Sequence, residues 1–302
     1  MSHGPRNPFL ADSSYAMAHG RCDQQDNVPW RGPEGPTEVL GDDDIQYSWL
    51  GPGHFGGLIS SPYPDGRRVI WSNGRQNIAK LDYETLEVLA DHEIVGGEGR
   101  TPQAELEQLV AGLDDLDGWD AINHAIEVSA RFMTGLDGIY ALVDCDNTLF
   151  LGRKDHAVAY VETDPSDPAS PIVERDRWNK PPEIEGFFLG INMTFDGRLV
   201  MTTDHGWVVV LERDFSSYEA IQIQRGEWDP AAYCKKMEEE LGHTGYGWVR
   251  TSCCVDEDNA IYLSSVDHHH KVRWTGERLS LDEADGAWSV PYRNGGGRGS
   301  GT

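Results

Sequence analysis

The sequence predicts an all-β fold, a β-propeller with about four visible blades and two helical insertions. A unit of turns and short strands recurs four times along the 302 residues, and the apolar runs are no longer than single strands. Helical spacing of apolar residues is confined to two segments between the repeats. Units of about 50 residues with three or four antiparallel strands each are typical of propeller blades.

The repeat is visible in four segments that align by eye. They read SSPYPDGRRVIWSNGRQNIAKLDYET from Ser60, YALVDCDNTLFLGRKDHAVAYVETD from Tyr140, INMTFDGRLVMTTDHGWVVVLERD from Ile191 and SCCVDEDNAIYLSSVDHHHKVRWTG from Ser252. Each holds a tight turn of the kind that joins antiparallel strands, at Asp65-Gly66, Asp146-Asn147, Asp196-Gly197 or Asp258-Asn259. A second polar turn follows eight or nine residues later, at Asn73-Gly74, Asp155-His156, Asp204-His205 or Asp267-His268. The near-constant offset indicates a common register for the four blades.

Two segments between the repeats have the pattern of helices. Residues 101–134 offer Thr101 as an N-cap with Pro102 at the first helical position. A second helix of this insertion is expected after Gly118, and its apolar face would comprise Ile122, Ala125, Ile126 and Met133. Residues 229–242 are also expected to form a helix, since they begin with Asp-Pro and end with glycine.

The rest of the chain divides into three parts. Residues 1–36 are rich in proline and glycine and predict an extended N-terminal arm, residues 37–292 hold the blades with their inserts, and residues 293–302 predict a flexible glycine-rich tail. The last repeat loses its pattern after Trp274. Because a propeller is stable when its first and last blades pair, we expect the ring to be completed by a second polypeptide or by residues removed in processing.

Charge and composition exclude several classes of protein. The chain carries 51 acidic against 25 basic residues, and a formal net charge of -26 repels a nucleic-acid backbone. This surplus could suit a salt-rich cytosol or attract divalent cations, or it is simply a solvated acidic surface. Residues 1–20 lack a basic flank followed by an apolar stretch, and no apolar run reaches a bilayer span, so neither export nor membrane insertion is expected. Five cysteines without metal-ribbon spacing indicate a reducing cytoplasm.

Polar residues that could form a site are expected at one face of the disc. The innermost strand of a blade starts on the face that carries the turns between its second and third strands. This placement gathers the residues expected to hold a divalent metal, which are Asp155, His156, Asn192, Asp204, His205, Asp267 and His268. His54, His205 and Arg250 are the catalytic candidates at the same face.

Three consecutive histidines, His268 to His270, follow Asp267. Because neighbours on a strand point to opposite faces, His268 and His270 can share one side while His269 takes the other. The three rings therefore cannot all bind one metal on a regular strand.

The Asp-His pair also occurs at 155–156 and 204–205, and two interpretations remain open. Imidazoles from several blades could converge on a transition metal while each aspartate orients a ring. Alternatively, the pair recurs because the hairpin recurs, with aspartate accepting backbone hydrogen bonds in each turn. Asn192, Asp204 and Asp155 offer oxygen ligands, so calcium is the other candidate metal.

The blade pattern, as in FDGRLVMTTDHGWVVVLER and PDGRRVIWSNGRQNIAKLD, resembles that of the six-bladed propellers of the senescence-marker, gluconolactonase and strictosidine-synthase-like superfamily. The resemblance covers roughly residues 45–290 and depends on turn and strand spacing. It implies a central site, often with calcium, and hydrolase or lyase chemistry on small organic substrates. Asn192 matches the central asparagine of such a site, whereas its acidic partners are not placed.

These observations predict a small-molecule enzyme, a metal-dependent hydrolase or lyase with its site at the channel mouth. The alternative is a non-catalytic propeller scaffold for protein–protein interaction. A third interpretation, a quinone or other redox cofactor stacked on Trp71 or Trp207, requires one of these rings at the axis. An enzyme predicts bound metal and a concave polar pocket, whereas a scaffold predicts a filled channel and an exposed apolar patch.

Overall fold

The computed structural model describes most of the chain, with gaps. The described residues are 5–25, 31–32, 34–46, 48–94, 99–113, 115–132, 140–223, 232, 235–236, 239 and 248–292. The predicted helix at 229–242 lies mostly outside them, and the predicted tail at 293–302 lies wholly outside them. No helix within the described residues is long and apolar enough to cross a membrane.

The structure is a β-propeller of four antiparallel sheets, which we call blades 1 to 4 in chain order. Blade 1 comprises β1 (Phe55–Ile59), β2 (Val69–Asn73), β3 (Asn77–Asp82) and β4 (Val88–Glu93). Blade 2 comprises β5 (Ala141–Val143), β6 (Leu149–Gly152), β7 (His156–Glu162) and β8 (Ile172–Asn179). Blade 3 comprises β9 (Phe188–Met193), β10 (Leu199–Thr203), β11 (Trp207–Leu211) and β12 (Tyr218–Gln222). Blade 4 comprises β13 (Cys254–Val255), β14 (Ala260–Ser264), β15 (His268–Trp274), β16 (Leu279–Ser280) and β17 (Trp288–Pro291).

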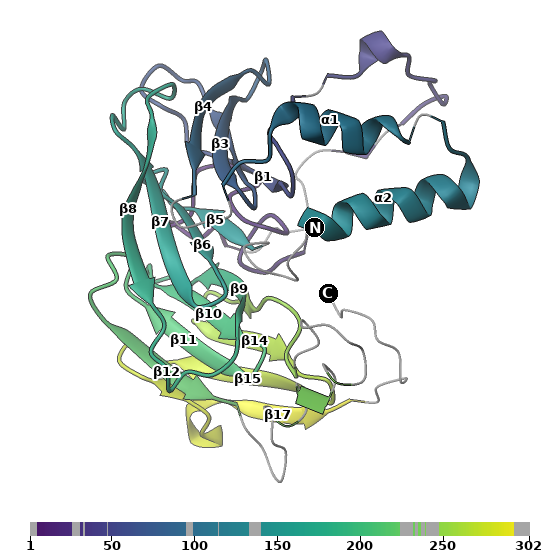
Figure 1. Ribbon diagram of the computed structural model, residues 1–302. Coiled ribbons are helices and arrows are strands. Elements are labelled where there is room, and N and C mark those ends of the chain that lie inside the picture. The colour runs from purple at the N-terminus through teal and green to yellow at the C-terminus, as the bar shows by residue number, and fades with distance from the viewer. Residues whose placement is uncertain are drawn as a thin grey trace.

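The four blades follow one another along an arc (Figure 1). The innermost strands β1, β5, β9 and β13 lie side by side in that order, as the outer strands β4 and β8 also do. Blades 1 and 4 stand at opposite ends of the arc, and the two helices lie on its open side (Figure 1). The core lies between the blades, because β2, β3, β6 and β10 are buried almost throughout while the outer strands are half exposed.

The predicted first turn is confirmed in all four blades. Gly66, Asn147, Gly197 and Asn259 have φ angles of 87°, 62°, 90° and 60°, which glycine and asparagine tolerate best. A capping side chain that the sequence analysis missed precedes each turn. In each blade its side-chain oxygen accepts a hydrogen bond of 2.8 to 2.9 Å from the backbone amide of the first residue of the next strand, or of the residue just before it. The four acceptors are Ser60 Oγ, Asp144 Oδ1, Thr194 Oγ1 and Asp256 Oδ1.

Blade 4 continues beyond Trp274, contrary to the expectation that its pattern ends there. Strand β16 pairs with the end of β15, and β17 pairs with its beginning, so the two short strands share the outer position. The short 3-10 helix Glu283–Asp285 separates them and is capped by the side chain of Asp282. The sequence pattern weakens here because one long strand is replaced by two short ones.

The insertion between blades 1 and 2 folds into the helices α1 (Gln103–Ala111) and α2 (Gly118–Phe132). Pro102 rather than Thr101 is the N-cap of α1, and no side chain caps this end. Helix α2 packs on α1, with His124 Nε2 at 3.2 Å from the carbonyl oxygen of Leu109. A further 3-10 turn, Asp42–Asp44, precedes blade 1.

The described N-terminal residues 5–25 form a plug along the inner edges of the blades. The carbonyl of Tyr15 accepts from Ile59 of β1, and that of Ala16 accepts from Val143 of β5 at 2.7 Å. The plug also contacts the other two blades. Asn7 Nδ2 donates to the carbonyl oxygen of Met193 in β9 at 3.1 Å, and the carbonyl oxygen of Cys22 accepts from the amide of Val255 in β13 at 2.9 Å. Met17 is fully buried. The segment expected as an extended arm is thus, over these residues, part of the core.

Candidate functional site

The sequence analysis placed a metal at the second turns of the blades. In two of the three Asp-His pairs found there, the aspartate contacts the histidine of its own hairpin. His156 Nδ1 lies 2.7 Å from Asp155 Oδ1, and this contact lowers the pKa of Asp155. His268 Nδ1 lies 3.1 Å from Asp267 Oδ2. In both hairpins the carboxylate faces its own histidine.

The third pair, Asp204 and His205, is arranged differently. Asp204 is buried, and its Oδ1 accepts a hydrogen bond of 2.6 Å from the amide of Phe187. Burial raises the pKa of Asp204. A Cβ on Gly186 would lie 2.2 Å from Asp204 Oδ1, so the preceding loop closes tightly over the carboxylate. His205 Nδ1 lies 3.7 Å from Glu185 Oε2, which is beyond hydrogen-bond range.

The three consecutive histidines alternate along β15 as expected. The rings of His268 and His270 lie 5.9 Å apart, while His269 stacks on Tyr292 at 4.5 Å. Both nitrogens of the buried His270 face hydroxyls, those of Ser265 and Ser289, each at 3.1 Å. His270 is therefore a hydrogen-bonded core residue.

Asn192, the expected calcium ligand, is fully buried and has all its polar atoms engaged. Its Nδ2 donates to the carbonyl oxygens of Cys22 at 2.9 Å and Cys253 at 2.6 Å. Its Oδ1 accepts from the amide of Met193 at 2.8 Å. The side chain thus joins β9 to the plug and to the start of blade 4.

The catalytic candidate His54 lies in a small polar network of blade 1. Its ring nitrogens lie 2.9 Å from Ser72 Oγ and 3.0 Å from Asn77 Oδ1. Burial lowers the pKa of His54, which favours the neutral ring. A Cβ on Gly74 would lie 2.4 Å from His54 Nε2, so the imidazole ring packs directly against the backbone of Gly74. Arg250 is half-buried before β13, at the entry to blade 4.

The candidate ligands are distributed over different blades. Among the residues that the structure describes, no three His, Cys, Asp or Glu side chains form a group that could hold a metal ion. Trp71, one of the rings considered for a redox cofactor, is fully buried in the core of blade 1. Trp207 is partly buried and packs against the same core.

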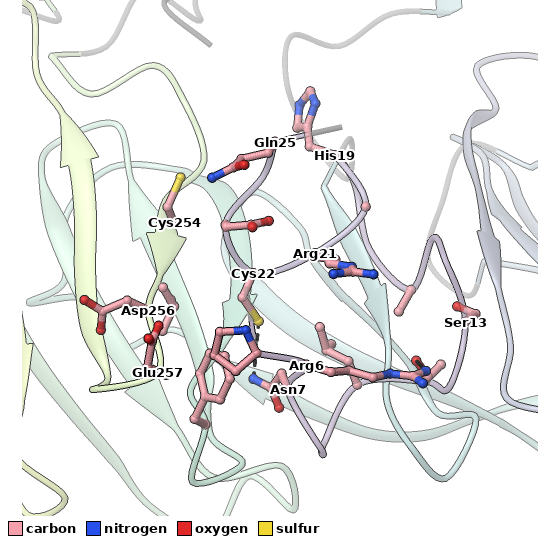
Figure 2. A pocket seen from close by; sticks show the side chains of 18 of the residues that line it. Arg6, Asn7, Ser13, His19, Arg21, Cys22, Gln25, Cys254, Asp256 and Glu257 are labelled. Atoms are coloured by element: carbon pink, nitrogen blue, oxygen red, sulfur yellow. Dashed lines mark hydrogen bonds between the residues drawn. The ribbon is translucent and has the colours of Figure 1, made fainter. Parts of the chain in front are cut away.

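A cavity of about 550 Å³ lies between the plug and the start of blade 4 (Figure 2). Arg6 and Arg21 of the plug line it on one side, and Asp256 and Glu257 line it on the other (Figure 2). Its size is within the range of small-molecule sites. Sequence reasoning missed this cavity, because the plug shows no periodic pattern that would place it beside β13.

The polar groups of this cavity are largely engaged in structure. Asp256 caps the first turn of blade 4 and also accepts from the hydroxyl of Tyr262 at 2.8 Å. Arg6 pairs with Asp12. Burial raises the pKa of Cys22 to about 12 and also raises that of Cys254, so both are thiols rather than nucleophilic thiolates at neutral pH.

A buried charged network joins blades 1 and 2. Lys80 Nζ lies 3.3 Å from Glu162 Oε1 and donates to the carbonyl of Ser170 at 3.0 Å. The hydroxyl of Tyr63 donates to the same carboxylate. Lys80 also lies over the Trp71 ring, with 5.3 Å between Nζ and the ring centroid. Since all these groups are inaccessible to a substrate, the network holds the two blades together.

Comparisons with known proteins leave both the superfamily and the activity open. No family model matches the chain. An uncharacterized protein of Archaeoglobus fulgidus is 23% identical over 296 residues. The matched region is 98% of this chain and 46% of that protein, so the chain spans less than half the length of this relative. A catalytically inactive virginiamycin B lyase from Staphylococcus aureus with quinupristin has a TM-score of 0.44 and 9% identity, over 78% of this chain and 57% of that one. The WD40 domain of SCAP from fission yeast has a TM-score of 0.34 and 8% identity, over 79% of this chain and 45% of that one. These likenesses are too distant to assign a superfamily or a reaction.

Proposed function

We propose that this chain is a non-catalytic propeller module that binds a protein partner. The observation that carries the proposal is the plug, which contacts the innermost strands of all four blades and so occupies the region where a propeller builds its central site. A plug along the innermost strands, together with an exposed apolar surface, favours a scaffold over an enzyme.

One exposed apolar surface of the described residues lies on α2. The side chains of Trp119, Ile122 and Ile126 are 77%, 46% and 59% exposed. Single exposed apolar residues are common on protein surfaces, but three on one helix face are typical of a helix that docks into a partner. The hydrogen bonds of Asp155, Asp267 and Asn192 within the fold support the structural interpretation of these polar residues.

A metal-dependent hydrolase or lyase is the second candidate, and the cavity beside the plug is the observation that favours it. In this case a small organic substrate would lie between Arg21 and the carboxylates of blade 4. A divalent metal, calcium or a transition metal, would supply the Lewis acid. The capping role of Asp256 and the protonated state of Cys22 weigh against this candidate.

The two candidates are separated by one paired experiment on the purified full chain. Tagged wild type and the variants Trp119→Asp and Tyr83→Asp are used to capture partners from extracts of cells that produce the protein. Tyr83 is an exposed aromatic residue in the turn after β3, so its variant is a matched control. The proposal expects a stoichiometric protein partner that Trp119→Asp loses and Tyr83→Asp keeps. Equal capture by all three, with a stoichiometric divalent metal in the wild type that His205→Ala lacks, would instead favour the enzyme.

A further inference from the structure

We infer that the cavity between the plug and blade 4 binds a short peptide of two or three residues with free termini. The carboxylate of this peptide would lie at Arg21, and its ammonium group would lie at Asp256 and Glu257. The inference goes beyond the function proposed above, because it concerns this cavity and does not depend on a partner at α2. It requires binding alone, and no bond of the peptide is broken.

Three charged side chains of the cavity wall are not used by the fold. Arg21, Asp23 and Glu257 form no side-chain hydrogen bond or ion pair with any residue that the structure describes. Arg21 is half-buried, and its guanidinium group offers several donors in a planar fork that matches a carboxylate. A guanidinium group in this position is therefore ready to bind an anion that enters the cavity.

The charges of the cavity are separated by sign. Arg21 lies on one side, and Asp256 and Glu257 lie on the other (Figure 2). Asp23 lies near Cys254 on the acidic side, since its negative charge contributes to the raised pKa of that thiol. Because Arg21 pairs with none of these carboxylates, both sides stay open to a ligand that carries a negative charge at one end and a positive charge at the other.

The width of the cavity determines the length of this ligand. A compact space of about 550 Å³ is roughly 10 Å across, and this size is within the range of small-molecule sites. The ammonium and carboxylate groups of a single amino acid are bonded to the same carbon, so they cannot reach both sides. Each further residue lengthens an extended chain by about 3.3 to 3.6 Å. Two or three residues therefore bring one terminus to Arg21 and the other to the carboxylates.

Apolar side chains form much of the wall between the two charged sides. They come from the plug and from blades 3 and 4, and they are Pro5, Leu10, Ala11, Ala16, Phe195 and Val255. Apolar side chains of a bound peptide would cover this surface and exclude water from it, which favours binding. A phosphate ion or a diamine would leave one charged side without a partner and the apolar wall exposed. The combined lining thus favours a peptide with apolar side chains.

Isothermal titration calorimetry of the purified full chain with trileucine tests the inference. Trileucine amide and N-acetyl-trileucine each lack one terminal charge, and leucine lacks the length. One trileucine should bind per chain with a dissociation constant on the order of 100 μM at low salt. The two blocked peptides and leucine should each bind at least about 10-fold more weakly, because each loses a charge-assisted hydrogen bond. Trileucine should also raise the melting temperature of the protein.

The variants Arg21→Gln and Glu257→Gln separate the two ends of the site. Arg21→Gln should bind trileucine and its amide with similar affinity, because the carboxylate has lost its partner. Glu257→Gln should reduce the difference between trileucine and N-acetyl-trileucine. Arg31→Gln, at an exposed arginine that does not line the cavity, is the matched control and should bind as the wild type does. Since the fold uses neither Arg21 nor Glu257, both variants should melt within about 2 °C of the wild type.

Three results would overturn the inference. The first is the absence of trileucine and dileucine binding by the wild type at about 5 mM peptide. The second is equal binding of trileucine and its two blocked forms, because neither terminus would then be recognised. The third is wild-type affinity for trileucine in both Arg21→Gln and Glu257→Gln, which would place the peptide outside this cavity. None of these results bears on the partner proposed for α2, which the capture experiment tests separately.

Discussion

Replacing Lys80 by methionine removes the ammonium group from the buried network between blades 1 and 2. The Lys80 side chain is fully buried, and its Nζ lies 3.3 Å from Glu162 Oε1. Methionine fills a similar volume without the charge, so the substitution leaves the packing nearly unchanged. Among the described residues, the hydroxyl of Tyr63 is then the remaining donor to the buried Glu162 carboxylate.

The expected loss of stability is about 4 kcal/mol. Removal of one member of a buried ion pair costs about 3 to 5 kcal/mol, because the other charge is left uncompensated. The carbonyl of Ser170 also loses its donor, which costs about 1 kcal/mol or more. Desolvation lowers the pKa of Lys80, so the ammonium itself is costly to bury and the total stays within this range. For a chain of this size the midpoint of thermal unfolding should fall by about 6 °C.

Guanidinium unfolding followed by tryptophan fluorescence measures this loss, since Trp71 lies beneath Lys80. The matched variants are Glu162→Gln and the double variant Lys80→Met with Glu162→Gln. The double variant should lie within about 2 kcal/mol of the wild type, because it holds no unpaired buried charge. A loss below about 1 kcal/mol for Lys80→Met would refute this reasoning. A double variant whose loss equals the sum of the two single losses would also refute it.

Three further predictions concern the candidate site and its surroundings. Asn192→Asp should lower the free energy of unfolding by more than about 3 kcal/mol, because a carboxylate would face two carbonyl oxygens. If this position instead bound calcium, added calcium would restore the stability of the variant in a melting assay. Asp204→Asn should keep the acceptor for the amide of Phe187 and should change the pH dependence of unfolding. Because the pKa of Asp204 is raised in the folded state, this group lowers the stability of the wild type as pH rises from about 4 through that raised pKa. Over this window the free energy of unfolding of the variant should increase relative to that of the wild type. Urea unfolding at stepped pH measures the difference. Gly190→Ala should cost about 1 to 3 kcal/mol, measured by the same unfolding assay, because its Cβ would lie 2.6 Å from the Cα of Ser252.

The blades could be predicted from sequence because their turns are determined locally. Gly66 and Asn147 follow an aspartate at positions where the backbone needs a positive φ, and few other residue types accept that conformation. The strands between these turns are short and rich in β-branched residues, which identifies them without knowledge of their neighbours. The number of blades and their common register follow from these two local features.

The plug could not be predicted, because long-range contacts alone determine its position. Asn7 bonds to the carbonyl of Met193, and Cys22 bonds to Asn192, across more than 160 residues of sequence. Residues 5–25 show neither helical nor strand periodicity, since their backbone groups bond to strands of blades 1, 2 and 4 in an irregular order. Their proline and glycine content is equally compatible with an exposed arm, so composition does not distinguish an arm from a plug.

Repetition itself explains why the Asp-His pairs of different blades do not meet at one point. Equivalent positions of successive blades are related by rotation about the propeller axis, so they lie on a ring and are held apart by the strands between them. Asp155 and Asp267 illustrate the result, because each carboxylate meets the histidine of its own hairpin. A site at which several groups converge needs residues that break the repeat. Among the described residues, the parts that break it include the plug, the segment before blade 1 with its 3-10 turn, and the helices between blades 1 and 2. Since the plug is largely occupied with the core, α2 is an unrepeated surface that remains open, and the proposed binding is placed there for this reason.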